Sequence, residues 1–248
     1  MITVAVALAT TAGVIAAGSG TANAEDARRP ATAGAHGAAT PAVDPLTIIN
    51  IINAAYSAYK KFLQGGLSVQ DATNQIITAI NNAKTEIIAH IDAIATAQAK
   101  ACAEEAVVDF PSFNALSADN QQLFALNATG CQTLIDSLLT TVSDKGAVDQ
   151  LGFALNSLGP ITLIVRARTG LSNTGVTPIL VGDNQTVKTV LNPECGRIPE
   201  PGSPGEVLCE SYNGDTGQGT AAAARMEAGA RTSWALAKAV LPTITALP

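Results

Sequence analysis

The side chains that could carry acid, base or nucleophilic chemistry are few and scattered. The chain has two histidines, His36 and His90. An oriented nucleophile–histidine–carboxylate arrangement would have to use His90, because His36 lies in a segment without large apolar residues to hold it in place. No Gly-x-Ser-x-Gly elbow or other nucleophile signature accompanies it. We expect His90 to be structural, which leaves an unrecognised hydrolase as the third functional hypothesis.

Carboxylates gather at Glu104, Glu105 and Asp109. Paired carboxylates can perform acid–base work, but adjacent helical residues point about 100° apart, so a solvated face is expected. The glycine-rich stretch 213–217 has turn chemistry. It lacks the alternating oxygen ligands and final glutamate of a calcium loop, and it lacks the spacing of a phosphate cradle. We therefore predict no catalytic residue, no cofactor and no metal ion.

Four cysteines provide the clearest structural chemistry, at Cys102, Cys131, Cys195 and Cys209. An even number in an exported chain indicates disulfides. We favour the pairs Cys102–Cys131 and Cys195–Cys209, because each closes a short loop. A zinc site is the alternative, but no Cys-x-x-Cys spacing or histidine cluster supports it.

The segments that must position these residues are mainly helical. Between Ser68 and about Val108 no Gly or Pro interrupts the chain, and apolar residues follow an eleven-residue repeat. This pattern predicts one helix about 60 Å long, at about 1.5 Å per residue. Shorter helices are predicted from Pro45 to Gly65, from Ser117 to Val142, from Ala147 to Arg168 with a kink at Pro160, and from Thr220 to Leu241, where Pro242 ends the helix.

The composition changes after Gly170. Two β-branched runs, 178–181 and 186–191, flank a turn-forming stretch and predict a β-hairpin, with a third short strand at 206–209. The predicted fold class is mainly α. It is an elongated antiparallel helical bundle of about five helices, one of them very long, with a small disulfide-pinned β-hairpin and loop insertion before the last helix.

The N-terminus predicts export. Residues 1–24 combine an uncharged apolar run with a small-x-small cleavage site, which is typical of a signal peptide. A membrane anchor is the alternative, disfavoured by the weakly apolar Ala, Gly and Thr content. Residues 25–43 predict a disordered tail, since they hold almost no large apolar side chain. The bundle is placed at 44–169, the β and loop insertion at 170–217, and a C-terminal helix packing on the bundle at 218–248.

The net charge and the hydropathy pattern argue against some classes of function and favour others. A formal charge of −6 without a basic cluster argues against nucleic acid and anionic lipid as partners. The leading hypothesis is a secreted, extracellular, non-enzymatic interaction or structural protein, an adaptor or accessory subunit of an extracellular assembly. Its partner would be another secreted protein, and Arg28 and Arg29 in the tail are candidate partner-binding residues. The alternative is a membrane-active helical pore-forming toxin component, because residues 150–165 carry no charge; only this alternative implies membrane contact.

Overall fold

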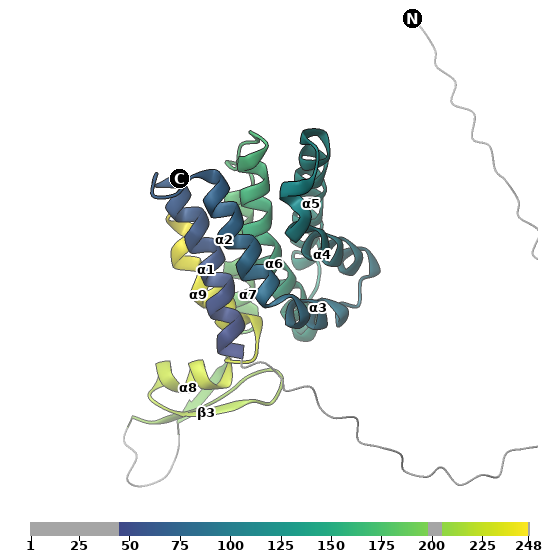
Figure 1. The fold of residues 1–248 in the computed structure, drawn as a ribbon. Coiled ribbons are helices and arrows are strands. Elements are labelled where there is room, and N and C mark those ends of the chain that lie inside the picture. Colours follow the sequence, from purple (N-terminus) through teal and green to yellow (C-terminus); the bar gives the residue numbers. More distant parts are fainter. Residues whose placement is uncertain (1–44, 198–204, 248) are drawn as a thin grey trace, which may run out of the picture. The chain divides into compact units, whose positions relative to one another are not determined.

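The computed structural model describes residues 45–197 and 205–247 (Figure 1). The predicted signal peptide and the tail with His36, Arg28 and Arg29 lie outside these ranges. The described residues are mostly helical and contain nine α-helices, a short 3-10 helix and one three-stranded antiparallel sheet. The helices are α1 (Pro45–Leu63), α2 (Val69–Asn82), α3 (Lys84–Asp92), α4 (Ala97–Asp109), α5 (Ala118–Leu139), α6 (Lys145–Arg168), α7 (Val176–Val190), α8 (Ala221–Ala228) and α9 (Ser233–Thr245), with the 3-10 helix η1 at Phe110–Ala115.

Helix boundaries with clear capping chemistry agree with the sequence. Gly65 follows α1 with a φ of 75°, which favours glycine and stops the helix. Ser68 accepts a hydrogen bond from the Asp71 N–H at 3.0 Å and so caps α2. Ser117 caps α5 in the same way.

The prediction of one very long helix from Ser68 to Val108 is wrong. The segment forms α2, α3 and α4 instead. At Ala83 the backbone leaves the helical region, with φ −110° and ψ 8°. Asn81 and Asn82, which precede this break, are weak helix formers. The chain leaves the helix again between Asp92 and Ala97.

The apolar spacing of that segment nevertheless identified its buried side chains. Most of the predicted core positions are buried although the helix is interrupted: Ala72, Ile76, Ile80, Ala83, Ile87, Ile91 and Ile94. Val69 and Cys102 are half-buried, and the predicted position Gln98 is exposed. Burial of an apolar stripe constrains which residues face the core, but it does not require one uninterrupted helix axis. Several short helices can present the same stripe.

Helix α6 runs through the centre of the helical core. All residues from Leu151 to Val165 are buried, and α6 contacts α1, α2, α3, α4, α5, α7 and α9. Pro160 lies inside the helix, as predicted. Gly159 permits a close approach, because a Cβ there would collide with the hydroxyl of Tyr56 on α1.

The predicted β-hairpin at 178–191 is also wrong, since this segment forms α7. Its β-branched composition favoured strands, but its buried residues Val176, Leu180, Val187 and Leu191 are spaced at helical intervals. Tertiary packing overrides β propensity here. The predicted turn lies within the helix, where Asp183 and Asn184 are buried.

The sheet lies later in the chain than the predicted hairpin. Strand β2 (Val207–Glu210) pairs with β1 (Glu194–Arg197) on one side and β3 (Thr216–Gly219) on the other. Strand β2 confirms the short strand predicted near 206–209. Helix α8 lies beside β3 and packs mainly on β2 and β3 (Figure 1). A second, small core forms there from Cys209, Ala224 and Ala228.

The single C-terminal helix predicted from Thr220 to Leu241 is two helices, α8 and α9. The chain turns at Gly229, whose backbone lies so close to Trp234 that a Cβ would come within 2.5 Å of the ring. Pro242 lies inside α9 rather than ending it. Trp234 and Leu236 on α9 join the main helical core.

Candidate binding site

A hollow on the described surface lies against the sheet. Its volume is about 720 Å³. Residues of the α7–β1 connection, β1, β2, the β2–β3 connection and the start of α6 line it: Lys145, Asn192, Glu194, Cys195, Gly196, Arg197, Leu208, Glu210, Ser211 and Tyr212. We call this hollow the sheet pocket. Its lining combines the apolar side chain of Leu208 with charges of both signs, a composition suited to binding.

Alternation along β1 and β2 decides which side chains face the sheet pocket. Cys195 and Cys209 are directly opposite each other, and Cys209 belongs to the small core under α8. Successive strand residues point to opposite faces. Glu194, Gly196 and Leu208, together with Glu210, therefore lie on the face away from α8.

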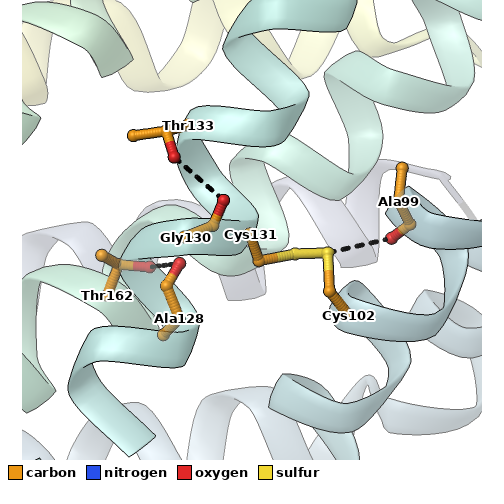
Figure 2. Close-up of a disulfide and its surroundings, with 7 residues drawn as sticks. All are labelled: Ala99, Cys102, Ala128, Gly130, Cys131, Thr133 and Thr162. Carbon is orange, nitrogen blue, oxygen red and sulfur yellow. Dashed lines mark hydrogen bonds between the residues drawn. A yellow bond between two sulfur atoms is a disulfide. The ribbon is translucent and has the colours of Figure 1, made fainter. Parts of the chain in front are cut away.

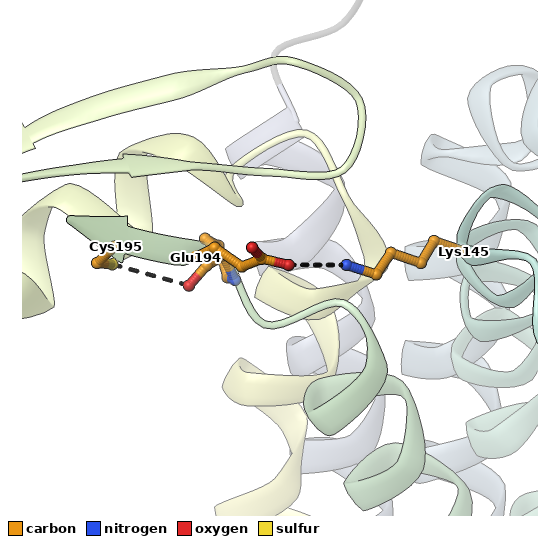
Figure 3. A network of polar contacts seen from close by, with 4 residues as sticks. Lys145, Glu194 and Cys195 are labelled. Atoms are coloured by element: carbon orange, nitrogen blue, oxygen red, sulfur yellow. Dashed lines mark hydrogen bonds and ion pairs between the residues drawn. The ribbon is translucent and has the colours of Figure 1, made fainter.

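Two carboxylates and one amine meet at one end of the pocket. Glu194 and Glu210 are cross-strand partners. The Lys145 ammonium on α6 lies 3.3 Å from Glu194 Oε1 (Figure 3). Like charges directly across a ladder disfavour each other, so a single lysine leaves this end with excess negative charge.

The other end contains an exposed apolar side chain, Leu208, near Arg197. Leu208 pairs with Gly196 and is 47% exposed, although it is a large hydrophobic side chain. A Cβ at Gly196 would meet nothing within 4 Å. Open space therefore lies above Leu208, and the sheet presents an uncovered apolar spot.

Asp149 connects the pocket wall to the helices. Its Oδ2 accepts a hydrogen bond from the Tyr212 hydroxyl at 2.7 Å, and its Oδ1 accepts one from the Ser233 N–H at the start of α9. Burial, and then the Asp149 carboxylate, raise the pKa of Tyr212. Tyr212 is thus held in a fixed place as a neutral hydrogen-bond donor.

Ser211 borders the pocket, but its side chain does not face it. The residue is 3% exposed, and its Oγ has no hydrogen-bond partner within the described part of the chain. Two residues beyond Cys209, it shares the α8 side of the sheet with that cysteine.

His90 does not form a catalytic arrangement with the described residues. Its ring on α3 stacks on Phe153 with centroids 3.9 Å apart. Burial against α6 lowers the pKa of His90, partly opposed by Asp149. Both oxygens of that carboxylate already accept hydrogen bonds. The hydroxyl of Ser233, whose N–H bonds to Asp149, is not available as a nucleophile for His90 either. It lies against Gly152 in the interior and has no hydrogen-bond partner in the described ranges.

The acidic cluster of α4 lies elsewhere. Glu105 and Asp109 border a separate groove of about 300 Å³ between α4, η1 and α5. The stretch 213–217 forms the end of the turn between β2 and β3 and the start of β3, and Asn213 Oδ1 accepts the Asp215 N–H at 3.1 Å. Within residues 45–197 and 205–247, no group of three or more His, Cys, Asp or Glu side chains could hold a metal ion.

Both disulfides are present, in the pairing that the short loops favoured. Cys102–Cys131 joins α4 to α5 with a Cα–Cα distance of 5.6 Å (Figure 2). Thr162 on α6 donates to the Ala128 carbonyl nearby, at 3.4 Å. Cys195–Cys209 joins β1 to β2 with a Cα–Cα distance of 4.0 Å. The first bond fixes two helices of the main core, and the second fixes the sheet.

The sequence interpretation did not identify the pocket residues. The alternation of 207–210 about Cys209 could have placed Leu208 and Glu210 on the face opposite the disulfide. Nothing local to Lys145 indicates Glu194 as its partner, because the two are separated by 49 residues. Such a pair is visible only once the chain has folded.

No protein family, curated protein or solved structure matches the chain. Among the described residues, one helix, α6, is long and apolar enough to cross a membrane. In its most apolar stretch of 18 residues, 83% is buried inside the protein.

Proposed function

We propose that this chain is an exported, non-enzymatic interaction protein, an adaptor or accessory subunit of an extracellular assembly, which holds its partner at the sheet pocket. The observation that carries the proposal is Leu208, a large apolar side chain exposed beside open space and bordered by charges. Apolar spots rimmed by polar residues are typical of interaction sites. The two disulfides are compatible with an extracellular location.

The finer parts of this proposal come from the sequence. They are the signal peptide, the elongated antiparallel arrangement of the bundle and the partner contact by Arg28 and Arg29. The tail contact would add a second point of attachment to the same partner. Deleting residues 25–43 should then weaken binding without abolishing the contact at the sheet pocket.

A crosslinking experiment tests the site. The photoreactive residue p-benzoylphenylalanine replaces Leu208 in the full chain, and the protein is illuminated in the secreted fraction of the producing organism. We expect one dominant crosslinked partner. The same replacement at Leu63, a similarly exposed leucine on α1, serves as the matched control. Equal or absent crosslinking at the two positions would contradict the proposal.

The pore-forming alternative has less support. The apolar character of α6 is explained by its place in the helical core, because 83% of its most apolar 18-residue stretch is buried there. A core helix of a soluble protein has this composition for packing reasons. The alternative remains testable by dye release from vesicles.

A further inference from the structure

Strand β1 has an edge to which another strand can bind. The sheet order is β1-β2-β3, so β1 pairs on one side only. The Cα atoms of Cys195 and Cys209 are 4.0 Å apart, which marks a pair without mutual backbone hydrogen bonds. The N–H and C=O of Cys195, and of Arg197 two residues later, therefore point away from β2. No backbone group of the described residues bonds to them.

The sheet pocket extends over this same edge. All four residues of β1 line it. Helix α8 packs mainly on β2 and β3 and leaves β1 the least covered strand. Free backbone donors and acceptors beside a lined hollow are the requirements for strand addition, in which main-chain hydrogen bonds supply affinity and side-chain pockets supply specificity.

The side chains beside that edge define what the added strand should carry. Lys145 forms its ion pair with Glu194, and Glu210, the cross-strand partner of Glu194, has no ion pair within the described residues. This leaves a place for a second positive charge. Two residues further along β1, the open space over Gly196 leaves Leu208 uncovered. Residues two apart on a strand share a face, so one strand can satisfy both places at once.

We infer that β1 accepts an extended segment of the partner protein as a fourth antiparallel strand. The segment carries a large apolar residue and a basic residue two positions apart. The apolar side chain covers Leu208 over Gly196, and the basic side chain lies on Glu194 and Glu210. This inference rests on the proposed function and specifies the partner's chemistry.

Capped, fluorescent pentapeptides test the inference by anisotropy with the full processed chain. Thr-Phe-Thr-Lys-Thr places Phe and Lys on one face, whereas Thr-Thr-Phe-Lys-Thr places them on opposite faces. We expect the first peptide to bind at least about tenfold more tightly. Gly196→Trp fills the open space and should weaken it by a similar factor. Gly182→Trp on α7, where a Cβ also meets nothing within 4 Å, should leave binding unchanged.

A charge swap tests the acidic end separately. Glu210→Lys should weaken the Lys peptide about tenfold and strengthen Thr-Phe-Thr-Glu-Thr, since close charge pairs discriminate partners. Circular dichroism and mass analysis of the Cys195–Cys209 bond verify that each variant is folded. A peptide preference that ignores spacing, or a Glu peptide that Glu210→Lys does not strengthen, overturns the inference.

The remaining outcomes separate this inference from the proposed function. A second copy of the chain on the edge would give a dimer by sedimentation that Gly196→Trp dissociates, and this result overturns strand donation by a partner. Crosslinking from position 208 that Gly196→Trp abolishes, without any peptide preference, leaves the proposed function standing and removes the strand motif. Loss of both the crosslink and the peptide binding removes both proposals.

Discussion

Among the described acidic residues, Asp183 is the one that is buried. It lies on α7 and is 4% exposed, and its Oδ2 has no partner in the described ranges. Burial, and then the facing Asp136 carboxyl on α5, raise the pKa of Asp183 to about 8. The neighbouring Tyr56 hydroxyl on α1 is fully buried, and burial followed by the charge of Asp183 raises its pKa as well. A protonated Asp183 is therefore the form that the folded chain favours.

This residue predicts a pH dependence of stability. An unfolded aspartate loses its proton near pH 4, whereas folded Asp183 keeps it to about pH 8. Its contribution to the free energy of unfolding is complete below pH 4 and disappears as the pH rises through about 8. We expect urea denaturation to give a free energy of unfolding lower at pH 8 than at pH 5 by at least about 1.4 kcal/mol, one pKa unit.

The Asp183→Asn variant isolates the effect. It cannot ionise, so its stability should vary less between pH 5 and pH 8 than that of the unaltered chain. Asp109→Asn, at an exposed position on α4, should keep the original dependence. An unchanged pH profile in Asp183→Asn would show that other groups cause the dependence.

At the scale of elements, the contact between α1 and α6 depends on the absence of a side chain at Gly159. The Tyr56 hydroxyl lies where a Cβ would be, and that hydroxyl has no hydrogen-bond partner in the described chain. We expect Gly159→Ala to lower the free energy of unfolding by about 3 kcal/mol, through overpacking in a core that cannot expand locally.

A double-mutant cycle checks the cause. Tyr56→Phe removes an unpartnered buried hydroxyl and should change stability by less than about 1 kcal/mol. In that background Gly159→Ala should cost less than it does alone, because the colliding atom is gone. If Gly159→Ala lowers the free energy of unfolding equally in both backgrounds, the Tyr56 hydroxyl is not the atom that the new methyl group meets. Chemical denaturation of the four proteins provides the measurement.

The sheet is an element whose own core is small, so its disulfide matters locally. Cys195–Cys209 spans 14 residues, and a loop of this size contributes about 3 kcal/mol in the chain-entropy account. Replacing both cysteines with alanine should speed amide exchange in β1, β2 and β3, leave α1 to α6 protected and abolish crosslinking from position 208. Replacing Cys102 and Cys131 instead should lower global stability and leave that crosslink in place.

The elements also show what the sequence could and could not predict. Periodicity identified the buried stripe of Ile76, Ile80, Ile87 and Ile91, because burial depends on spacing. It did not predict the helix breaks, which depend on how short helices pack around α6. The pattern of β-branched residues in α7 favoured a hairpin, and only its neighbours α5, α6 and α9 make that segment helical.

In the candidate site, too, the features set by the local sequence were predictable, and the contacts between distant residues were not. The loop lengths between cysteines favoured the disulfide that builds the sheet, since closure of short loops is a property of the sequence. The meeting of Lys145 with Glu194 depends on the fold, and so does the position of Tyr212 on Asp149. Residues that act through distant partners carry no local signal.

At the scale of the whole described chain, the buried apolar residues form two separate cores. The large helical core centres on α6, and the small core lies under the sheet. Helix α6 also holds buried polar groups, and Asn156 donates to Asn184 on α7 at 2.8 Å. Moving α6 into a bilayer would break this bond and transfer its amides to hydrocarbon, which is costly.

The whole-molecule prediction is that the chain does not permeabilise membranes. Its formal charge of −6 provides no attraction to anionic lipid, and α6 is stabilised by its contacts with the surrounding helices. We expect no dye release from anionic or neutral vesicles at pH 7 or at pH 5. Folded Asp183 already holds its proton at pH 7, so acidification to pH 5 adds no charge at α7, and through proton linkage it favours the folded chain rather than the release of α6. Leakage that rises on acidification would restore the pore-forming alternative and remove the interaction protein as the leading function.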